Sequence, residues 1–75
     1  MEFYCIGDDD AVRGFRLAGV RGRAVNGAAA TAEALEEAAA RADCGVIIIT
    51  SAAAGLVRAR LNEIKERSRP LIAEI

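Results

Sequence analysis

The feature of this sequence that most constrains its fold is an uninterrupted apolar run, Val46–Ile49, within the segment Gly45–Thr50. All residues of the run are β-branched, which favours a strand over a helix. Because neighbouring side chains on a strand point to opposite faces, a run without polar residues is apolar on both faces. This pattern is typical of a central strand in a parallel sheet that helices cover on both sides.

Three further segments are predicted to be strands, and they alternate with helical segments. Phe3–Ile6 and Leu71–Ile75 are largely apolar. Val20–Val25 contains a glycine and two arginines, which are tolerated at the edge of a sheet. Right-handed crossovers then predict one α/β domain over residues 1–75. Its sheet is open, four-stranded and parallel, in the order 2-1-3-4, with helices on both faces, as in Rossmann-like and receiver-like folds.

The first two helical segments carry start and stop signals. Asp8, or the aspartate after it, is predicted to cap the first helix, which stops at Gly19. Thr31 is predicted to cap the second helix. Glu37 and Arg41 are four residues apart in the favourable orientation, so we expect them to form an ion pair along that helix.

The third helical segment is predicted to be a single helix. Thr50 or the following serine is a suitable N-cap, and Arg69-Pro70 ends the helix because proline cannot continue it. The apolar residues that recur at helical spacing, and so form its inner face, are Ala53, Val57, Leu61 and Ile64.

Composition narrows the class of protein further. The net charge is −1 and 53% of the residues are hydrophobic, which argues against a disordered chain and a nucleic-acid binder. The apolar runs are too short to cross a membrane, and the N-terminus lacks a signal-peptide pattern, so we expect a cytoplasmic protein. Cys5 and Cys44 fall toward opposite ends of the sheet and are expected to be free, buried thiols. One core of this size supplies only about 3–5 kcal/mol, so such chains often depend on a partner.

An acidic cluster, Asp8–Asp10, follows the first strand and could hold Mg²⁺, as in phosphoacceptor receiver domains. That chemistry also needs an aspartate after the third strand and a nearby lysine. Thr50-Ser51 stands after the third strand, where that aspartate would be needed, and Lys65, the one lysine, falls on a helix. The chain contains no histidine that could activate a hydroxyl nucleophile. We therefore expect no catalytic residue, metal or cofactor, and interpret the aspartates as a helix cap. A receiver-like signalling or protein-interaction domain without its own catalysis is the alternative function.

Two groups of arginines could be solvated surface or a protein interface, where arginine is enriched. The first group surrounds the first helix and second strand: Arg13, Arg16, Arg21 and Arg23. The second lies on and after the third helix: Arg58, Arg60, Arg67 and Arg69.

Taken together, these motifs resemble the F subunit of the V/A-type ATP synthases. Ile6–Val20 is similar to the opening of that family, in which a strand and a Gly-Asp turn precede a Gly-Phe-Arg-Leu-Ala-Gly helix. Gly45–Thr50 is similar to its Gly-Ile-Ile-Ile-Ile-Thr strand, and Pro70–Ile75 to its last strand. Ser51 stands where the family commonly has glutamate. The family normally continues into a C-terminal helix, whereas this sequence stops at Ile75, so the regulatory role of that tail is not expected of this chain.

The resemblance implies a non-catalytic central-stalk subunit of a rotary ATPase, peripheral to the membrane. Its implied partners are the coiled-coil rotor subunit, which is the D subunit of these complexes, and other central-stalk subunits. It would help to couple ATP synthesis or hydrolysis to ion transport. No nucleic acid and no insertion into the membrane are implied. The resemblance does not indicate which face of the domain binds the partner. The candidate interface residues are Arg13, Phe15, Arg16, Leu17, Arg58 and Arg67.

Overall fold

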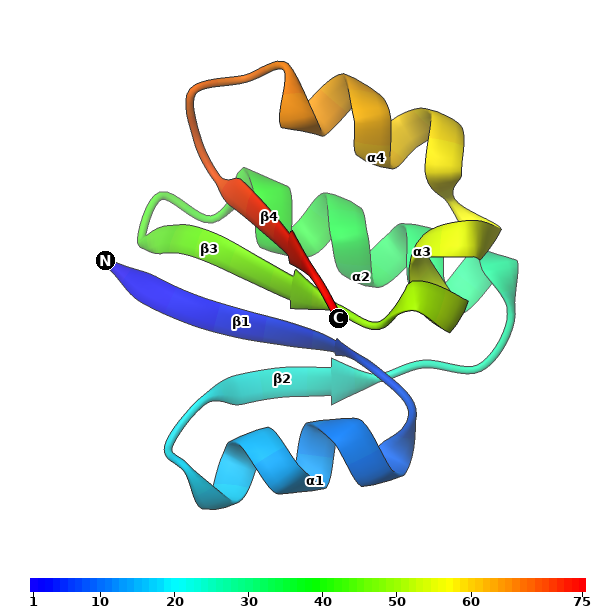
Figure 1. Ribbon diagram of the computed structural model, residues 1–75. Helices are drawn as coiled ribbons and strands as arrows, with labels where there is room; N and C mark the ends of the chain where they lie inside the picture. Colours follow the sequence, from blue (N-terminus) through cyan, green and yellow to red (C-terminus); the bar gives the residue numbers. More distant parts are fainter.

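The apolar run forms a central strand in the computed structural model, which describes residues 1–75. Strand β3 (Cys44–Ile49) lies between β1 (Glu2–Gly7) and β4 (Leu71–Glu74), and β2 (Arg21–Ala24) pairs with the far side of β1. All three pairings are parallel and the order is β2-β1-β3-β4 (Figure 1). The predicted fold class and strand order are confirmed.

Helices cover both faces of this sheet, but unequally. Helix α1 (Asp9–Leu17) packs against β1 and β2. Helix α2 (Ala28–Ala40) packs against β1 and β3 and contacts α3 (Ser51–Leu56), which is followed by α4 (Arg58–Lys65). Figure 1 shows α1 apart from the other three helices, with the sheet between them. This follows from right-handed crossovers, because the connection from β1 to β2 runs in the opposite direction along the sheet from the other two.

The main core lies between the sheet and α2, α3 and α4. Its strand residues come from one face, on which Ile6 lies beside Ile49. From the helices, Leu35, Leu61 and Ile64 are fully buried. The complete cluster is Ile6, Ala34, Leu35, Ala38, Cys44, Ile47, Ile49, Ala53, Ala54, Val57, Leu61 and Ile64. Burying such residues supplies most of the favourable free energy of folding.

A second, smaller core lies on the other face, beneath α1. Cys5, Val12 and Ile48 are buried but do not belong to the main cluster. Cys5 lies opposite Ile48 in the register, so their side chains share the face that α1 packs against. Both Cys5 and Cys44 are free and buried, as predicted, and burial raises the pKa of each thiol.

The prediction of a single third helix is wrong. The segment breaks at Val57, whose backbone (φ −134°, ψ 31°) leaves the helical region and separates α3 from α4. Gly55 and a β-branched valine are weak helix formers, so a break here costs little. Because of the break, α3 can bury Ala53 and Ala54 while α4, in a different direction, buries Leu61.

The predicted cap of the second helix is also wrong. Helix α2 begins at Ala28, directly after Gly27, because the alanines that follow this turn are the strongest helix formers. Gly27 adopts φ +90°, a conformation that glycine alone reaches without strain. Thr31 is fully buried in the helix, and its hydroxyl donates a hydrogen bond to the Gly27 carbonyl at 2.7 Å.

The expected ion pair between Glu37 and Arg41 does not form. Arg41 follows the helix with an extended backbone, so it leaves the i,i+4 position and binds Asp43 at 3.2 Å. Glu37 binds Arg23 of β2 instead, and Arg23 also binds Glu33, both at 2.6 Å. These contacts tie the edge strand β2 to α2.

Close packing at the end of β1 generates a stability prediction. A Cβ atom on Gly7 would lie 2.6 Å from Cγ2 of Thr50, which is closer than real Cβ contacts allow. We expect Gly7→Ala to lower the free energy of unfolding by about 1–3 kcal/mol through overpacking. Thr50→Ser removes that methyl group but keeps the hydroxyl, so adding it to Gly7→Ala recovers most of the loss. Urea unfolding of both single variants and the double variant measures the coupling; strictly additive losses would contradict the clash.

A salt bridge between α4 and β4 generates a pH prediction. Arg58 donates two hydrogen bonds, of 2.7 and 2.9 Å, to the Glu74 carboxylate, which holds the pKa of Glu74 below its ordinary value. The pKa of Glu36 is lowered beside Arg60, and that of Asp43 beside Arg41. A carboxyl whose pKa is lower in the folded state stabilises the fold above its unfolded pKa, and this contribution is lost as pH falls through the folded value. We therefore expect the melting temperature to fall below about pH 4.5. Glu74→Gln should make that fall shallower; an unchanged pH profile would show that the pair contributes nothing.

Candidate partner interface

The carboxyl edge of the sheet, where open α/β folds bind ligands, uses its polar side chains as helix caps. Asp8 accepts a hydrogen bond from the Ala11 backbone N–H at 2.8 Å, and Thr50 accepts one from the Ala53 N–H at 3.3 Å. These caps are the ones predicted for the first and third helices. The Ser51 hydroxyl donates to the Ile75 carbonyl at 2.9 Å.

A small cavity lies at this edge, where the strand order reverses between β1 and β3. Its volume is about 160 Å³, below the roughly 300–1,000 Å³ of typical small-molecule sites. Its polar lining includes Asp8, Thr31 and Thr50, which all make the hydrogen bonds described above. No group of three or more Cys, Asp or Glu side chains is arranged to hold a metal ion. The geometry here suits helix capping.

The candidate residues on α1 lie on an accessible surface. Arg13, Arg16 and Leu17 are exposed, the last with 86% of its surface accessible, and Phe15 is half-buried. Neither Arg13 nor Arg16 forms an ion pair within the chain. Two unpaired cations beside an exposed leucine can bind a partner that offers carboxylates around an apolar contact.

The candidates on and after α4 are placed differently. Arg58 is held by Glu74, so its guanidinium is already engaged. Arg67 is exposed, and its charge helps to lower the pKa of Glu36. Since α4 packs on the opposite side of the sheet from α1, the structure does not bring the two arginine groups together (Figure 1).

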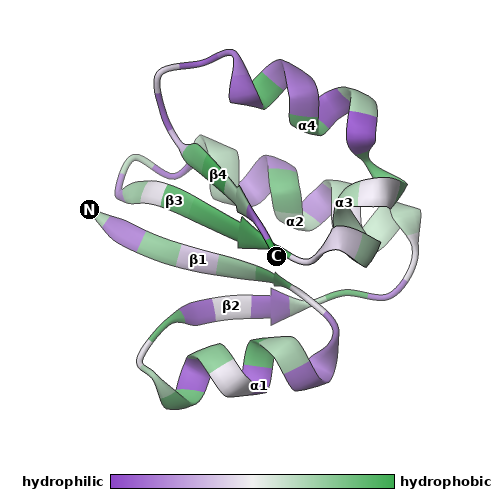
Figure 2. Ribbon diagram, viewed as in Figure 1, coloured by the Kyte–Doolittle hydropathy of each residue, from purple (hydrophilic) through white to green (hydrophobic).

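An apolar sheet face beside α1 was not anticipated from the sequence. The residues that define this open apolar face are Phe3, Val46, Leu71, Ala73 and Ile75. The register puts Phe3 opposite Val46 and Val46 opposite Leu71, so they share the face on which α1 lies. Phe3 is 46% exposed, Leu71 60% and Ile75 56%. Figure 2 shows β3 and the start of β4 as strongly hydrophobic. The predicted strand order could have revealed it. In that order only one crossover places a helix on this face, and one helix cannot cover four strands.

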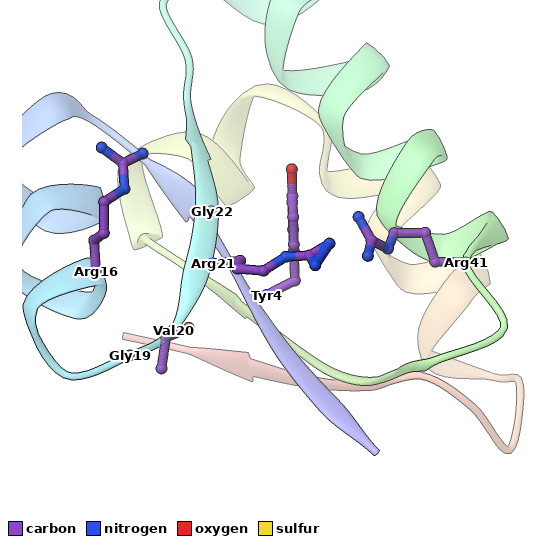
Figure 3. Close-up of a pocket in the computed structure, with 7 residues that line it drawn as sticks. All are labelled: Tyr4, Arg16, Gly19, Val20, Arg21, Gly22 and Arg41. Carbon is purple, nitrogen blue, oxygen red and sulfur yellow. The ribbon is translucent and has the colours of Figure 1, made fainter.

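A third surface feature is a cluster of arginines at the opposite end of the strands. Tyr4, Arg21 and Arg41 line an open pocket of about 410 Å³, in which Arg41 stacks on the Tyr4 ring at 5.6 Å. Figure 3 shows the Arg21 and Arg41 side chains converging beside this ring, with Arg16 on the other side of β2. Asp43 forms a salt bridge with Arg41 and so neutralises its charge. The pocket can accept a carboxylate from a partner protein.

The sequence matches the family described as ATP synthase (F/14-kDa) subunit over residues 3–75. The chain belongs to this family. The crystal structure of the F subunit of the V-type ATP synthase from Archaeoglobus fulgidus has the same fold, with a TM-score of 0.79 and 25% sequence identity. The match covers 99% of this chain and 95% of that one. No curated protein sequence matches.

Family membership places this α/β domain among the subunits of ATP synthase complexes, which have protein partners. The segment that carried the resemblance, Gly14–Gly19, forms the second half of α1 and the turn after it. That half borders the open apolar face. No helix is both long enough and apolar enough to cross a membrane.

The assignment of Asp8 as a cap can be tested directly. We expect Asp8→Ala to lower the free energy of unfolding by about 1 kcal/mol, because the Ala11 N–H loses its acceptor. Asp10→Ala is the matched control and should cost less, since its carboxylate makes no hydrogen bond within the chain. Melting curves with and without millimolar Mg²⁺ should coincide for the parent chain. A Mg²⁺-dependent rise in melting temperature that Asp8→Ala abolishes would instead favour a receiver-like metal site.

Proposed function

We propose that this chain is a non-catalytic central-stalk subunit of a V/A-type rotary ATPase. In this role it binds the coiled-coil rotor subunit (the D subunit), contacts other central-stalk subunits, and helps to couple ATP synthesis or hydrolysis to ion transport. It works on the cytoplasmic side of the membrane as a peripheral part of the complex. The observation that carries the proposal is the match to a family of ATP synthase subunits along nearly the whole chain.

Two structural features support a binding role over catalysis. At the carboxyl edge, the side chains of the cap residues Asp8 and Thr50 each accept a hydrogen bond from a backbone N–H group. The surface around α1 instead combines unpaired arginines with exposed apolar side chains, among them Leu17 and Leu71. Exposed apolar surface with a polar rim is a mark of protein–protein contact.

The proposal is tested by co-expression with the D subunit of the same rotary ATPase. We expect a stable complex with one copy of each chain, measured by size-exclusion chromatography with light scattering. If the two chains migrate separately at micromolar concentrations, the proposed function is wrong.

Charge reversal then asks which arginines contribute. Arg13→Glu and Arg16→Glu should each weaken binding about 10- to 100-fold, the effect of about 1–3 kcal/mol at an interfacial charge. Arg67→Glu is the control on the other side of the sheet and should change the affinity less than twofold. Arg58→Glu is unsuitable, because it would place a second carboxylate against Glu74 and destabilise the fold. If only Arg67→Glu weakened binding, the interface would instead lie on the side of the sheet that carries α4.

A further inference from the structure

Two arginines converge on the α2 side of the sheet, near the amino ends of its strands. Arg21 of β2 lies opposite Tyr4 of β1 in the register, and Tyr4 shares its face with Ile6 of the main core. Arg41 directly follows α2, so its side chain reaches the same place from the end of the helix. Figure 3 shows the two guanidinium groups pointing toward one another beside the Tyr4 ring. Three separate elements therefore build the pocket of about 410 Å³ that these residues line.

Arg41 is held in position within the isolated chain. Its Nε and Nη2 atoms donate hydrogen bonds of 3.2 and 3.3 Å to the two carboxylate oxygens of Asp43. Its guanidinium also lies over the Tyr4 ring, 5.6 Å from the centroid, at a distance that allows a cation–π interaction. A side chain that is already fixed loses little conformational freedom when a ligand binds. Because a guanidinium has five N–H donors, Arg41 keeps donors for a further acceptor.

Arg21 lacks a counter-charge of its own. It is exposed and belongs to none of the ion pairs within the chain. The nearby carboxylates do not serve it: Asp43 binds Arg41 at 3.2 Å, and Glu37 binds another arginine of β2 at 2.6 Å. Glu2, on the same face of β1, forms no ion pair either. Two guanidinium groups thus face one carboxylate, which leaves one positive charge uncompensated.

This charge favours a single carboxylate as the ligand. One uncompensated cation matches one negative charge, whereas a phosphate dianion would also face the carboxylate of Asp43. Two converging guanidinium groups can donate to both oxygens of a carboxylate. Small-molecule sites bury most of the ligand against apolar walls, but this pocket is open, and only Tyr4 and Val20 give it apolar side chains. The carboxylate that fits best is therefore an acidic side chain of another protein.

We propose that this pocket receives an aspartate or glutamate side chain from a second partner in the complex, distinct from the rotor subunit. The distinction rests on the proposed function, which puts the contacts of the rotor subunit at Arg13 and Arg16 of α1. Arg21 and Arg41 lie on the α2 side, and Figure 3 shows β2 between them and Arg16. The chain then contacts two neighbours, one on each side of its sheet.

The carboxylate chemistry is tested on the isolated chain. Sodium acetate replaces sodium chloride at constant ionic strength while NMR follows the side-chain Nε–H signals of the arginines. We expect the Arg21 and Arg41 signals to shift saturably, with a dissociation constant of about 10–100 mM, the range for a few charged hydrogen bonds. Arg21→Gln should abolish saturation at Arg41 and keep the melting temperature, because Arg21 is exposed and unpaired. Arg67→Gln removes another exposed, unpaired arginine and should leave the titration unchanged.

Two results on the isolated chain would overturn the pocket. If the Arg21 and Arg41 signals move no more than that of Arg67, the pocket has no preference for a carboxylate. If inorganic phosphate, titrated in the same way, binds more tightly than acetate, the site takes a dianion and the assignment to an acidic side chain is wrong.

The source of the carboxylate is tested in the assembled complex. A carbodiimide joins an amine to a carboxylate that contacts it, and Lys65 is the one lysine of the chain. In a Lys65→Arg background, Arg21→Lys places a side-chain amine in the pocket, and Arg67→Lys places one at an exposed site outside it. We expect mass spectrometry to find an amide between position 21 and an acidic residue of a subunit other than D. Its yield should exceed that at position 67 about tenfold, because contact favours the reaction.

The remaining outcomes separate this proposal from the proposed function. An amide from position 21 only to Asp43 or Glu2 of the same chain would show that the pocket is neutralised internally. A product with the D subunit, or a yield no higher than at position 67, would also overturn the second partner. In all these cases the proposed function stands if the parent chain binds the D subunit. If the parent chain fails to bind D while acetate saturates the pocket, the proposed function is wrong and the carboxylate chemistry of the pocket stands.

Discussion

Burial of β3 on both faces is the constraint on which the rest of the structure depends. Ile47 and Ile49 project into the main core, and Ile48 projects toward α1. A strand that is apolar on both sides is stable only when each side is covered. The sheet must therefore form with β3 inside it, and helices must pack on opposite faces. Every other feature, including where the sheet is left open, follows from how three crossovers meet this demand.

The three crossovers place more helices on one face of the sheet than on the other, and the less covered face is part of the candidate interface. Two connections run one way along the sheet and deliver α2, α3 and α4 to one face, whereas the first runs the other way and delivers α1 alone. Helix α1 covers β1 and β2 and shields Cys5, but the outer part of that face, around Leu71, stays exposed. The open apolar face is thus a consequence of the direction of the three crossovers.

Local patterns in the sequence were enough to predict the strands and two of the caps. The β-branched run identified β3, and Asp8 identified the start of α1, because both signals depend on residues close in sequence. What failed depended on tertiary contacts. Glu37 binds Arg23 from another element, Thr31 is drawn into the core, and the chain bends at Val57 so that α4 can pack. Of the candidate site, α1 could be found from its motif, but the open apolar face beside it could not, since it needs the strand order and the register together.

The same open face links binding to stability. A single core of this size contributes only about 3–5 kcal/mol, and here one side of the sheet leaves Phe3, Leu71 and Ile75 in water. A partner laid over them would bury apolar surface that the isolated chain leaves in contact with water. Because a partner that binds only the folded chain stabilises it by mass action, the assembled complex would hold this domain more firmly than its own contacts do. Covering these apolar residues with a partner would therefore stabilise the domain as well as bind it.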